Sequence, residues 1–299
     1  MEIGLIGIGR MGAAIGERLI DQGHHLTIWN RSAAKTKPLV ERGASFAASP
    51  AAVGDAGEIV LTILTDASAI ASVYDAAQGL LTGGIAGKLL IDMSTVAPET
   101  TRALAHRVRA KGAGFVECPV GGTVAPARDG KLLGMAGGSV EDFARAKPIL
   151  DQLCRRVDRL GPNGAGSAMK LAINLPLIVY WEALGEALSL VSDAGIPPEK
   201  MIEILTESSG GTNAVKTRGP KLVAALKDGA RPEVGFDIDG MRKDLRTMLA
   251  VARERGIELP LVTRALECYD GAAHDGWSGR DGSNIAVYRL EKTRRAKDA

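Results

Sequence analysis

The stretch Met1-Glu-Ile-Gly-Leu-Ile-Gly-Ile-Gly-Arg-Met-Gly-Ala-Ala-Ile-Gly16 decides the fold of the first half of the chain. Its apolar run Ile3–Ile6 predicts a buried strand that leads into a glycine pattern and then a helical stretch. In such a unit Gly7 permits a tight turn, Gly9 lets the backbone approach a pyrophosphate, and Gly12 allows the helix to pack closely on the strand. A helix that begins near Arg10 directs its first amides at phosphate groups.

The pattern therefore predicts a dinucleotide site, and the alternative is a glycine-rich turn that binds nothing. The predicted contacts are Gly7, Ile8, Gly9, Arg10, Met11 and Gly12.

Strand-like and helix-like segments alternate from this turn to about residue 120. The predicted strands are Ile3–Ile6, Leu26–Trp29, Ile59–Leu64, Leu89–Met93 and Phe115–Cys118. The predicted helices between them are Ala13–Gln22, Ala33–Arg42, Ala67–Asp75 and Pro98–Lys111. This alternation is typical of βαβ units around a parallel sheet.

Beyond about residue 160 the pattern becomes helical, with no convincing strand. Helical stretches are predicted at 165–194, 198–208, 215–228, 238–255 and 260–274. We therefore expect an α/β fold in which a Rossmann-type, doubly wound parallel sheet (1–162) precedes an all-α domain (163–299). A long interdomain helix joins the two.

The composition excludes several classes of protein. The 299 residues carry 37 basic and 35 acidic side chains, a net charge of +2, so we expect no nucleic-acid partner. The three cysteines and four histidines show no metal-ligand spacing, so we expect no metal site. No apolar run reaches the roughly 18 residues that span a bilayer, since Leu171–Trp181 is too short, and the amino terminus lacks a signal-peptide pattern. We expect a cytoplasmic protein.

The end of the second predicted strand selects the cofactor. An NAD-binding chain usually has Asp or Glu here, but this chain has Asn30-Arg31-Ser32. Asn30 cannot repel a 2′-phosphate, Arg31 can donate a fork of hydrogen bonds to it, and Ser32 adds a hydroxyl. We expect NADP to be preferred, with NAD possible; the alternative is that Arg31 is an ordinary exposed arginine. Leu64 and Thr65, at the end of the third predicted strand, complete the expected cofactor contacts.

Three later segments carry polar side chains at positions suited to chemistry. Ser94 and Thr95 follow the fourth predicted strand, where open α/β sheets bind ligands, although either could simply cap the next helix. The glycines of Cys118–Gly130 could present backbone donors to an anion or merely form a loop. Lys170 and Asn174 lie one turn apart in an apolar helical run, and the alternative is that the lysine simply extends to solvent.

These motifs together resemble those of the β-hydroxyacid dehydrogenase family, which includes 3-hydroxyisobutyrate dehydrogenase and several semialdehyde reductases. The resemblance covers nearly the whole chain and rests on ordered motifs at Gly7–Gly12, Asp92–Pro98, Pro119–Gly130 and Gly161–Asn174, with Lys243-Asp244-Leu245 as a fifth.

The resemblance implies roles for individual residues. Lys170 matches the catalytic lysine and Asn174 the asparagine that helps to hold substrate. Thr95 matches a residue beside the nicotinamide, and Lys243 a lysine that reaches cofactor or substrate. The predicted substrate contacts are Ser94, Gly121, Gly122, Thr123, Lys170 and Asn174. The family often has Ser-Gly-Gly after Pro-Val, whereas this chain has Gly121-Gly122-Thr123, so the substrate cannot be copied from a relative.

The expected reaction interconverts a small β-hydroxy acid and its semialdehyde. Lys170 would protonate the carbonyl oxygen in reduction and remove the proton in oxidation, which requires a pKa lowered by partial burial or by a cation such as Lys243. The expected partners are a small carboxylate-bearing substrate and a second copy of the chain, in a homodimer or homotetramer. The alternatives are an imine reductase on the same fold and a non-catalytic dinucleotide-binding protein.

Overall fold

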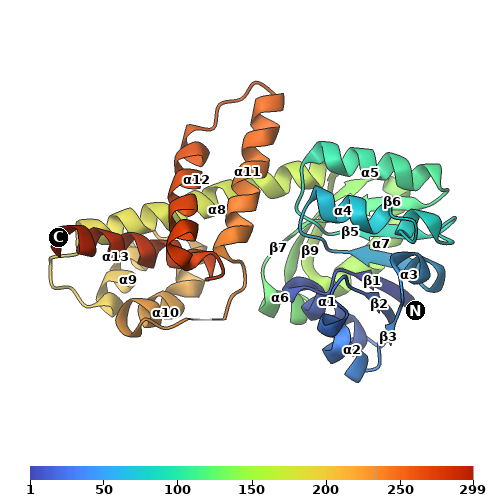
Figure 1. Ribbon diagram of the computed structural model, residues 1–299, viewed down its shortest axis with the longest axis horizontal. Helices are drawn as coiled ribbons and strands as arrows, with labels where there is room; N and C mark the ends of the chain where they lie inside the picture. The colour runs from blue at the N-terminus through green and yellow to red at the C-terminus, as the bar shows by residue number, and fades with distance from the viewer. Residues whose placement is uncertain (232, 299) are drawn as a thin grey trace. The chain divides into compact units, whose positions relative to one another are not determined.

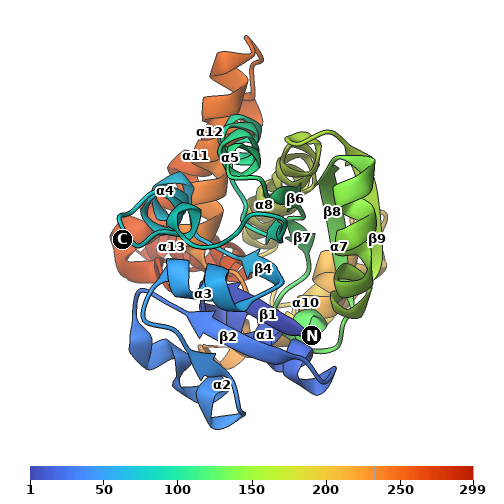
Figure 2. The same cartoon turned by 90° about the vertical axis from the view of Figure 1, so that its right-hand side faces the viewer.

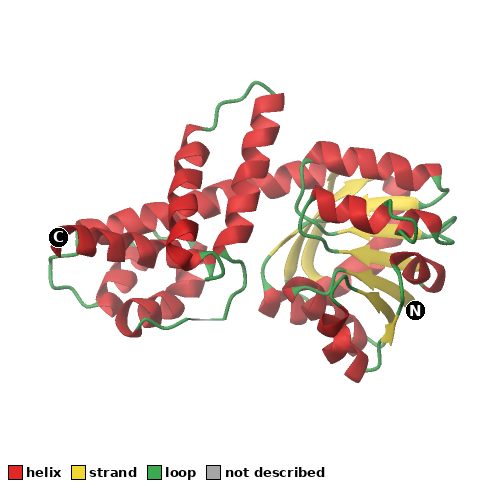
Figure 3. Ribbon diagram, viewed as in Figure 1, coloured by secondary structure: helices red, strands yellow, loops and turns green. Residues whose placement is uncertain are grey.

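The computed structural model describes residues 1–231 and 233–298, with the side chains of 296–298 left aside. The chain divides into two compact units, Met1–Leu171 and Ala172–Ala299. The first unit combines strands and helices, and the second is built from helices (Figures 1 and 3). The expected α/β class, with a sheet domain followed by a helical one, is confirmed.

Within the described residues, one nine-stranded sheet forms the centre of the first unit, in the order β3-β2-β1-β4-β5-β6-β8-β7, with β9 pairing β8. Its strands are β1 Glu2–Ile6, β2 His25–Trp29, β3 Ser45–Phe46, β4 Ile59–Thr62, β5 Leu89–Asp92, β6 Gly114–Glu117, β7 Val120–Gly121, β8 Leu132–Gly138 and β9 Cys154–Gly161. The strands from β3 to β6 are parallel to their neighbours, as predicted. β8 runs antiparallel to β6 and β7, which the sequence analysis did not foresee.

Helices cover both faces of this sheet because its strands are apolar on both sides. Ile3 and Leu5 of β1 share one core with α1 (Arg10–Asp21), α2 (Lys37–Glu41) and α7 (Val140–Leu153). Ile6 faces the opposite core with α3 (Pro50–Ala56), α4 (Ala67–Tyr74) and α5 (Pro98–Ala110). Figure 2 shows α3 and α1 on opposite sides of β1. This double covering is the arrangement that places strand ends and helix starts along one edge of the sheet.

Several predicted boundaries are wrong for local reasons. The helix expected at Ala33–Arg42 is broken into a 3₁₀ turn, Ala33–Thr36, and α2, because Pro38 is tolerated only in the first turn of a helix. The strand expected at Ile59–Leu64 ends at Thr62, so Leu64 lies in the loop that follows it. A short helix, α6 (Val124–Arg128), and the helices α3 and α7 were not predicted.

The second unit contains no named strand among its described residues, in agreement with the all-helical prediction. Its helices are α8 Ala165–Leu190, which begins in the first unit, α9 Pro198–Glu207, α10 Asn213–Asp228, α11 Ile238–Glu254, α12 Pro260–Ala272 and α13 Ile285–Asp298. α11 and α12 form an antiparallel hairpin (Figure 1). α13 was missed because its sequence is dominated by charged residues rather than by an apolar stripe.

The predicted long interdomain helix is α8. The two compact units meet within α8, after Leu171, because the first turns of α8 are bonded to the sheet through Glu117. The rest of α8 belongs to the helical unit.

α8 is long and apolar enough to cross a membrane by length and composition alone, with a mean hydropathy of 1.3 over an 18-residue stretch that is 44% buried. This differs from the expectation that the apolar run ends at Trp181, since the helix continues past Glu182 and Glu186. Buried helices of soluble proteins meet the same criterion, and here Trp181 and Leu188 are fully covered by protein.

Candidate active site

The turn between β1 and α1 has the steric features of a phosphate-binding loop. Gly7 has φ +99°, and a Cβ there or at Gly12 would lie under 3.0 Å from a backbone oxygen, that of Ile63 or Gly7 respectively. A Cβ on Gly9 would meet no protein atom within 4 Å. Gly9 is also the N-cap of α1 and contributes no side-chain cap. The protein itself therefore requires glycine at 7 and 12, and the open face at 9 fits the close approach of a pyrophosphate.

Asn30 connects this turn to the end of β2. Its Oδ1 accepts the amide hydrogen of Ile8 at 3.0 Å, and its Nδ2 donates to the carbonyl of Ser32 at 2.9 Å. Arg31 and Ser32 are exposed beside it. Asn30 was predicted to favour NADP because it lacks the carboxylate that would repel a 2′-phosphate. The structure shows in addition that its side chain holds the loop that carries Arg31.

A buried polar cluster lies at the ends of β4 and β5. The Ser94 hydroxyl donates to Asp92 Oδ1 at 2.7 Å and accepts the Leu64 amide at 2.8 Å, and Thr62 also donates to Asp92 Oδ1 at 2.7 Å. Ser94 is 2% exposed, so its hydroxyl braces the two loops against each other. Thr65, in contrast, is exposed. The support that Asp92 gives to these loops was not predicted, although a carboxylate at the end of an apolar strand was a signal.

Asp92 makes stability depend on pH. Burial raises its pKa from 3.8 to about 6, against the hydrogen bonds from Ser94 and Thr62 that lower it. The folded protein therefore binds the proton more tightly than the unfolded chain, and stability is lost as pH rises from about 4 to 6. Above pH 6 the cost of ionising the carboxyl is fully present, on the order of 3 kcal/mol at 1.36 kcal/mol per pKa unit.

Asp92→Asn keeps an acceptor oxygen for both hydroxyls and removes the charge. We expect the variant to be more stable than the unchanged protein at pH 8, by up to about 3 kcal/mol, and the advantage to shrink toward pH 4. Urea unfolding at pH 5 and pH 8 measures both. An equal or lower free energy of unfolding for the variant at pH 8 would show that the ionised carboxylate is not a cost to the fold.

The glycine segment after β6 presents backbone rather than side chains. Gly121 ends β7 and pairs with Leu133 of β8, Gly122 has φ +119°, and Thr123 is the N-cap of α6 without a side-chain cap bond. Position 121, where the family often has serine, is therefore a glycine that pairs with the antiparallel strand β8. The proposed contact of these residues with a substrate carboxylate stays a prediction.

Lys170 and Asn174 lie one turn apart on α8, and the structure adds an unpredicted partner to this pair. Asn174, 4% exposed, donates from Nδ2 to Asp244 Oδ2 at 2.7 Å. Lys243 Nζ lies 2.5 Å from Asp244 Oδ1, and Asp244 is 2% exposed. The helical unit therefore brings the predicted Asn174 and Lys243 together through Asp244. The position of Asp244 next to Lys243 in the fifth motif was the sequence signal for this contact.

Among the described residues, no group of three or more His, Cys, Asp or Glu side chains could hold a metal ion.

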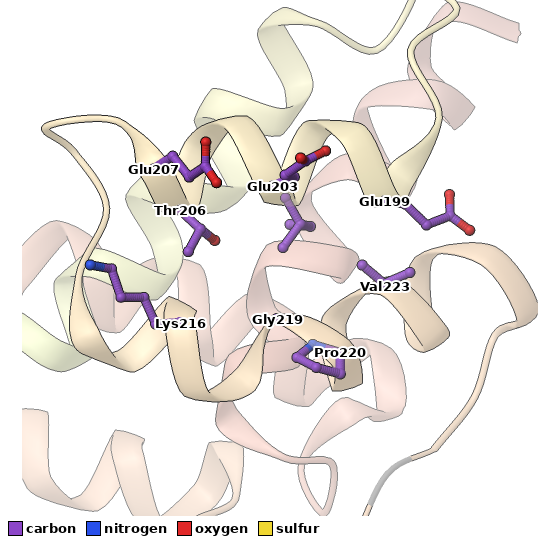
Figure 4. A pocket seen from close by; sticks show the side chains of 9 residues that line it. Glu199, Glu203, Thr206, Glu207, Lys216, Gly219, Pro220 and Val223 are labelled. Atoms are coloured by element: carbon purple, nitrogen blue, oxygen red, sulfur yellow. The ribbon is translucent and has the colours of Figure 1, made fainter.

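A hollow of about 430 Å³ lies between α9 and α10 and contains none of the predicted site residues (Figure 4). It is lined by Glu199, Ile202, Glu203, Thr206, Glu207, Lys216, Gly219, Pro220 and Val223. Two of its carboxylates are already paired, Glu199 with Lys227 and Glu203 with Lys200, each at 2.9 Å.

Two protein families match the chain, one for each part. Residues 2–161 match the family described as the NAD binding domain of 6-phosphogluconate dehydrogenase. Residues 164–289 match the one described as "NAD-binding of NADP-dependent 3-hydroxyisobutyrate dehydrogenase".

Individual relatives are similar along their whole length. Glyoxylate/succinic semialdehyde reductase 1 of Arabidopsis thaliana is 33% identical over 95% of this chain and 97% of its own. 3-Hydroxyisobutyrate dehydrogenase of Pseudomonas aeruginosa is 33% identical over 99% of each. The solved structure of Psf3 in complex with NADP+ and 2-OPP has a TM-score of 0.84 at 27% identity, over 96% of this chain and 99% of that one.

Proposed function

The chain belongs to the β-hydroxyacid dehydrogenase family, and on that premise we propose that it interconverts a small β-hydroxy acid and its semialdehyde with NADP(H). One observation supports the proposal above all: Lys170 and Asn174, which the motif resemblance matches to the family's lysine and asparagine, lie one turn apart on a helix whose start is bonded to the sheet. Relatives named as semialdehyde reductases and hydroxyacid dehydrogenases support the substrate class.

The cofactor-binding part of the proposal rests on the first unit. The turn at Gly7–Gly12 and the amides at the start of α1 would hold the pyrophosphate, and Arg31 and Ser32 would hold a 2′-phosphate. Thr95, Leu64 and Thr65 lie on loops at the carboxyl ends of β4 and β5, where such sheets bind ligands. When bound, the nicotinamide supplies or accepts the hydride.

Lys170 acts as the general acid in reduction and as the general base in oxidation. In reduction its ammonium donates a hydrogen bond, and then the proton, to the carbonyl oxygen as negative charge develops there. In oxidation the neutral amine takes the proton from the hydroxyl of the β-hydroxy acid. A primary amine is suited to both directions because its ammonium form can donate a proton and its neutral form can accept one.

Asn174 and its partners orient the substrate. Because Asp244 accepts from Nδ2, the asparagine amide is held in one of its two orientations. Lys243 places a positive charge beside the buried Asp244 carboxylate, so the carboxylate is not buried without a counter-charge. The backbone amides around Gly121 and Gly122 would bind the carboxylate of the substrate.

A screen of NADPH oxidation tests the function. Purified protein is assayed with succinic semialdehyde, tartronate semialdehyde, methylmalonate semialdehyde, glyoxylate and a sulfonated aldehyde, with NADH in parallel. We expect at least one short carboxylated or sulfonated aldehyde to be reduced, and a cyclic imine not to be. Turnover of the imine alone would indicate an imine reductase, and cofactor binding without any turnover would indicate a non-catalytic binding protein.

Arg31 is proposed to determine the cofactor preference. Arg31→Ala removes a charge-assisted hydrogen bond worth roughly 1.5–3 kcal/mol, so we expect KM for NADPH to rise about 10- to 100-fold. KM for NADH, which has no 2′-phosphate, should change less than about threefold on the same scale. Lys35→Ala, at another exposed basic residue of this segment, is the matched control. Equal losses with the two cofactors would show that Arg31 does not contact the 2′-phosphate.

A further inference from the structure

The first amides of α8 are bonded to a carboxylate from the sheet. Glu117, the last residue of β6, is 1% exposed. Its Oε1 accepts amide hydrogens from Gly164 at 2.7 Å, Gly166 at 2.8 Å and Ser167 at 3.3 Å, and its Oε2 lies 2.8 Å from the Gly164 nitrogen. A helix leaves its first amides without partners inside the helix, and a carboxylate there also interacts favourably with the helix dipole. Glu117 therefore caps α8 from a strand 47 residues earlier in the chain.

The glycine spacing before Lys170 follows from this cap. Gly164 has φ +98°, a conformation that L side chains rarely adopt. A Cβ on Gly166 would lie under 3.0 Å from the carbonyl oxygen of Met135 in β8. The two glycines thus let the backbone turn and come close enough to the sheet for its amides to reach Glu117. They serve the attachment of the helix rather than flexibility.

Further bonds fix the same turn from two other elements. The hydroxyls of Thr101 in α5 and Ser167 in α8 are 2.8 Å apart and buried. Asn163, just before the helix, donates to the carbonyl of Gly137 in β8 at 3.0 Å and accepts from Arg109 at 2.7 Å. The start of α8 is therefore attached to β6, β8 and α5.

Lys170 lies three residues after Ser167, within one turn of this attachment. At 1.5 Å per residue and 100° of rotation per residue, the height and direction of Lys170 are set by the turn that Glu117 holds. The burial of Glu117 is costly, since desolvation raises its pKa and the charge of Asp92 adds to the effect. The described partners of the carboxylate are backbone amides of the helix that carries the lysine.

We propose that Glu117 is a positioning residue for Lys170: it fixes the first turn of α8, and thereby the position from which the amine exchanges its proton with the substrate oxygen. This inference rests on the proposed function, in which Lys170 is the proton donor. It assigns a role in the reaction to a buried residue whose described hydrogen-bond partners are backbone amides.

The test compares Glu117→Gln with the unchanged enzyme and with Glu141→Gln, an exposed acid of α7 in the same unit. Glutamine keeps one acceptor oxygen but turns an NH2 group toward the amides. We expect kcat to fall about 10- to 100-fold, as a misplaced catalytic group does, while KM for NADPH changes less than twofold. The deuterium isotope effect on kcat from NADPH labelled at the transferred hydrogen should increase, since the chemical step becomes slower than product release. Glu141→Gln should resemble the unchanged enzyme.

A loss of folded protein alone would lower the active fraction without raising the isotope effect. Should Glu117→Gln not fold, Glu117→Asp keeps the charge one methylene short, and we expect the same isotope signature with a smaller fall in kcat. Hydrogen exchange of residues 164–171 in the NADP+-bound protein should be faster in either variant. Unchanged kcat and isotope effect, with Lys170→Ala inactive under the same assay, would overturn the role of Glu117 and leave the proposed function standing. An active Lys170→Ala would instead overturn the function of the lysine.

Discussion

Lys170→Ala is expected to lower kcat for aldehyde reduction by about 10²- to 10⁴-fold, the range typical of a lost general acid. Without the amine, the oxygen that gains negative charge in the transition state has neither a proton donor nor the neighbouring positive charge. KM for NADPH should hardly change, because Lys170 is not among the proposed cofactor contacts. Stopped-flow or steady-state NADPH oxidation with the best aldehyde of the screen measures both constants.

Two further variants make this result specific. Lys170→Arg keeps a positive charge on a long side chain but stays protonated at any working pH, so it should be defective in oxidation of the hydroxy acid. Met169→Ala, at the adjacent and exposed residue of α8, should keep nearly full activity. If Lys170→Ala retained more than a tenth of the activity, Lys170 would not be the proton donor.

Gly12→Ala should destabilise the protein by about 3 kcal/mol, the upper part of the range for overpacked positions. The added carbon would be forced against the carbonyl oxygen of Gly7, and neither backbone segment can move without opening the contact between α1 and β1. We expect a lower thermal unfolding temperature and a loss of NADPH binding.

Gly9→Ala is the matched comparison, because its Cβ meets no protein atom within 4 Å. Its free energy of unfolding should stay within about 0.5 kcal/mol of the unchanged protein, as for other surface substitutions. Its NADPH affinity should nevertheless fall at least about tenfold, equivalent to ~1.4 kcal/mol, because the methyl group occupies the space proposed for the pyrophosphate. Normal NADPH binding by Gly9→Ala would show that no phosphate approaches this turn.

The parts of the fold that could be read from the sequence are those with strong local patterns. β1, β4 and β5 carry polar side chains only at a strand end, and α11 and α12 begin and end within two residues of their predicted bounds. β8 and β9 were missed for opposite reasons. β8 is rich in glycine and alanine, whereas half of the residues of β9 are charged and β9 lies at the edge of the sheet, where it pairs with β8 alone.

The site residues proposed from the sequence are those whose own chemistry suggests a role. The glycine turn, Arg31, Lys170 and Asn174 were proposed from residue type and order, and their contacts with cofactor and substrate stay predictions. The residues that support them were not, because they come from distant parts of the chain: Asp244 is 70 residues from Asn174, and Glu117 is 47 from Gly164. Only folding reveals such pairs, although a lone carboxylate in the apolar strand ending at Glu117 was a visible anomaly.

The most direct test of the central claim is the distance from Lys170 Nζ to the reacting oxygen in a crystal structure with NADP+ and a β-hydroxy acid. We predict 2.6–3.2 Å, the hydrogen-bonding range of a general acid or base, with the hydroxyl carbon facing the nicotinamide. An amine that points away from the hydroxyl, with no hydrogen bond to it directly or through one water, would contradict the account.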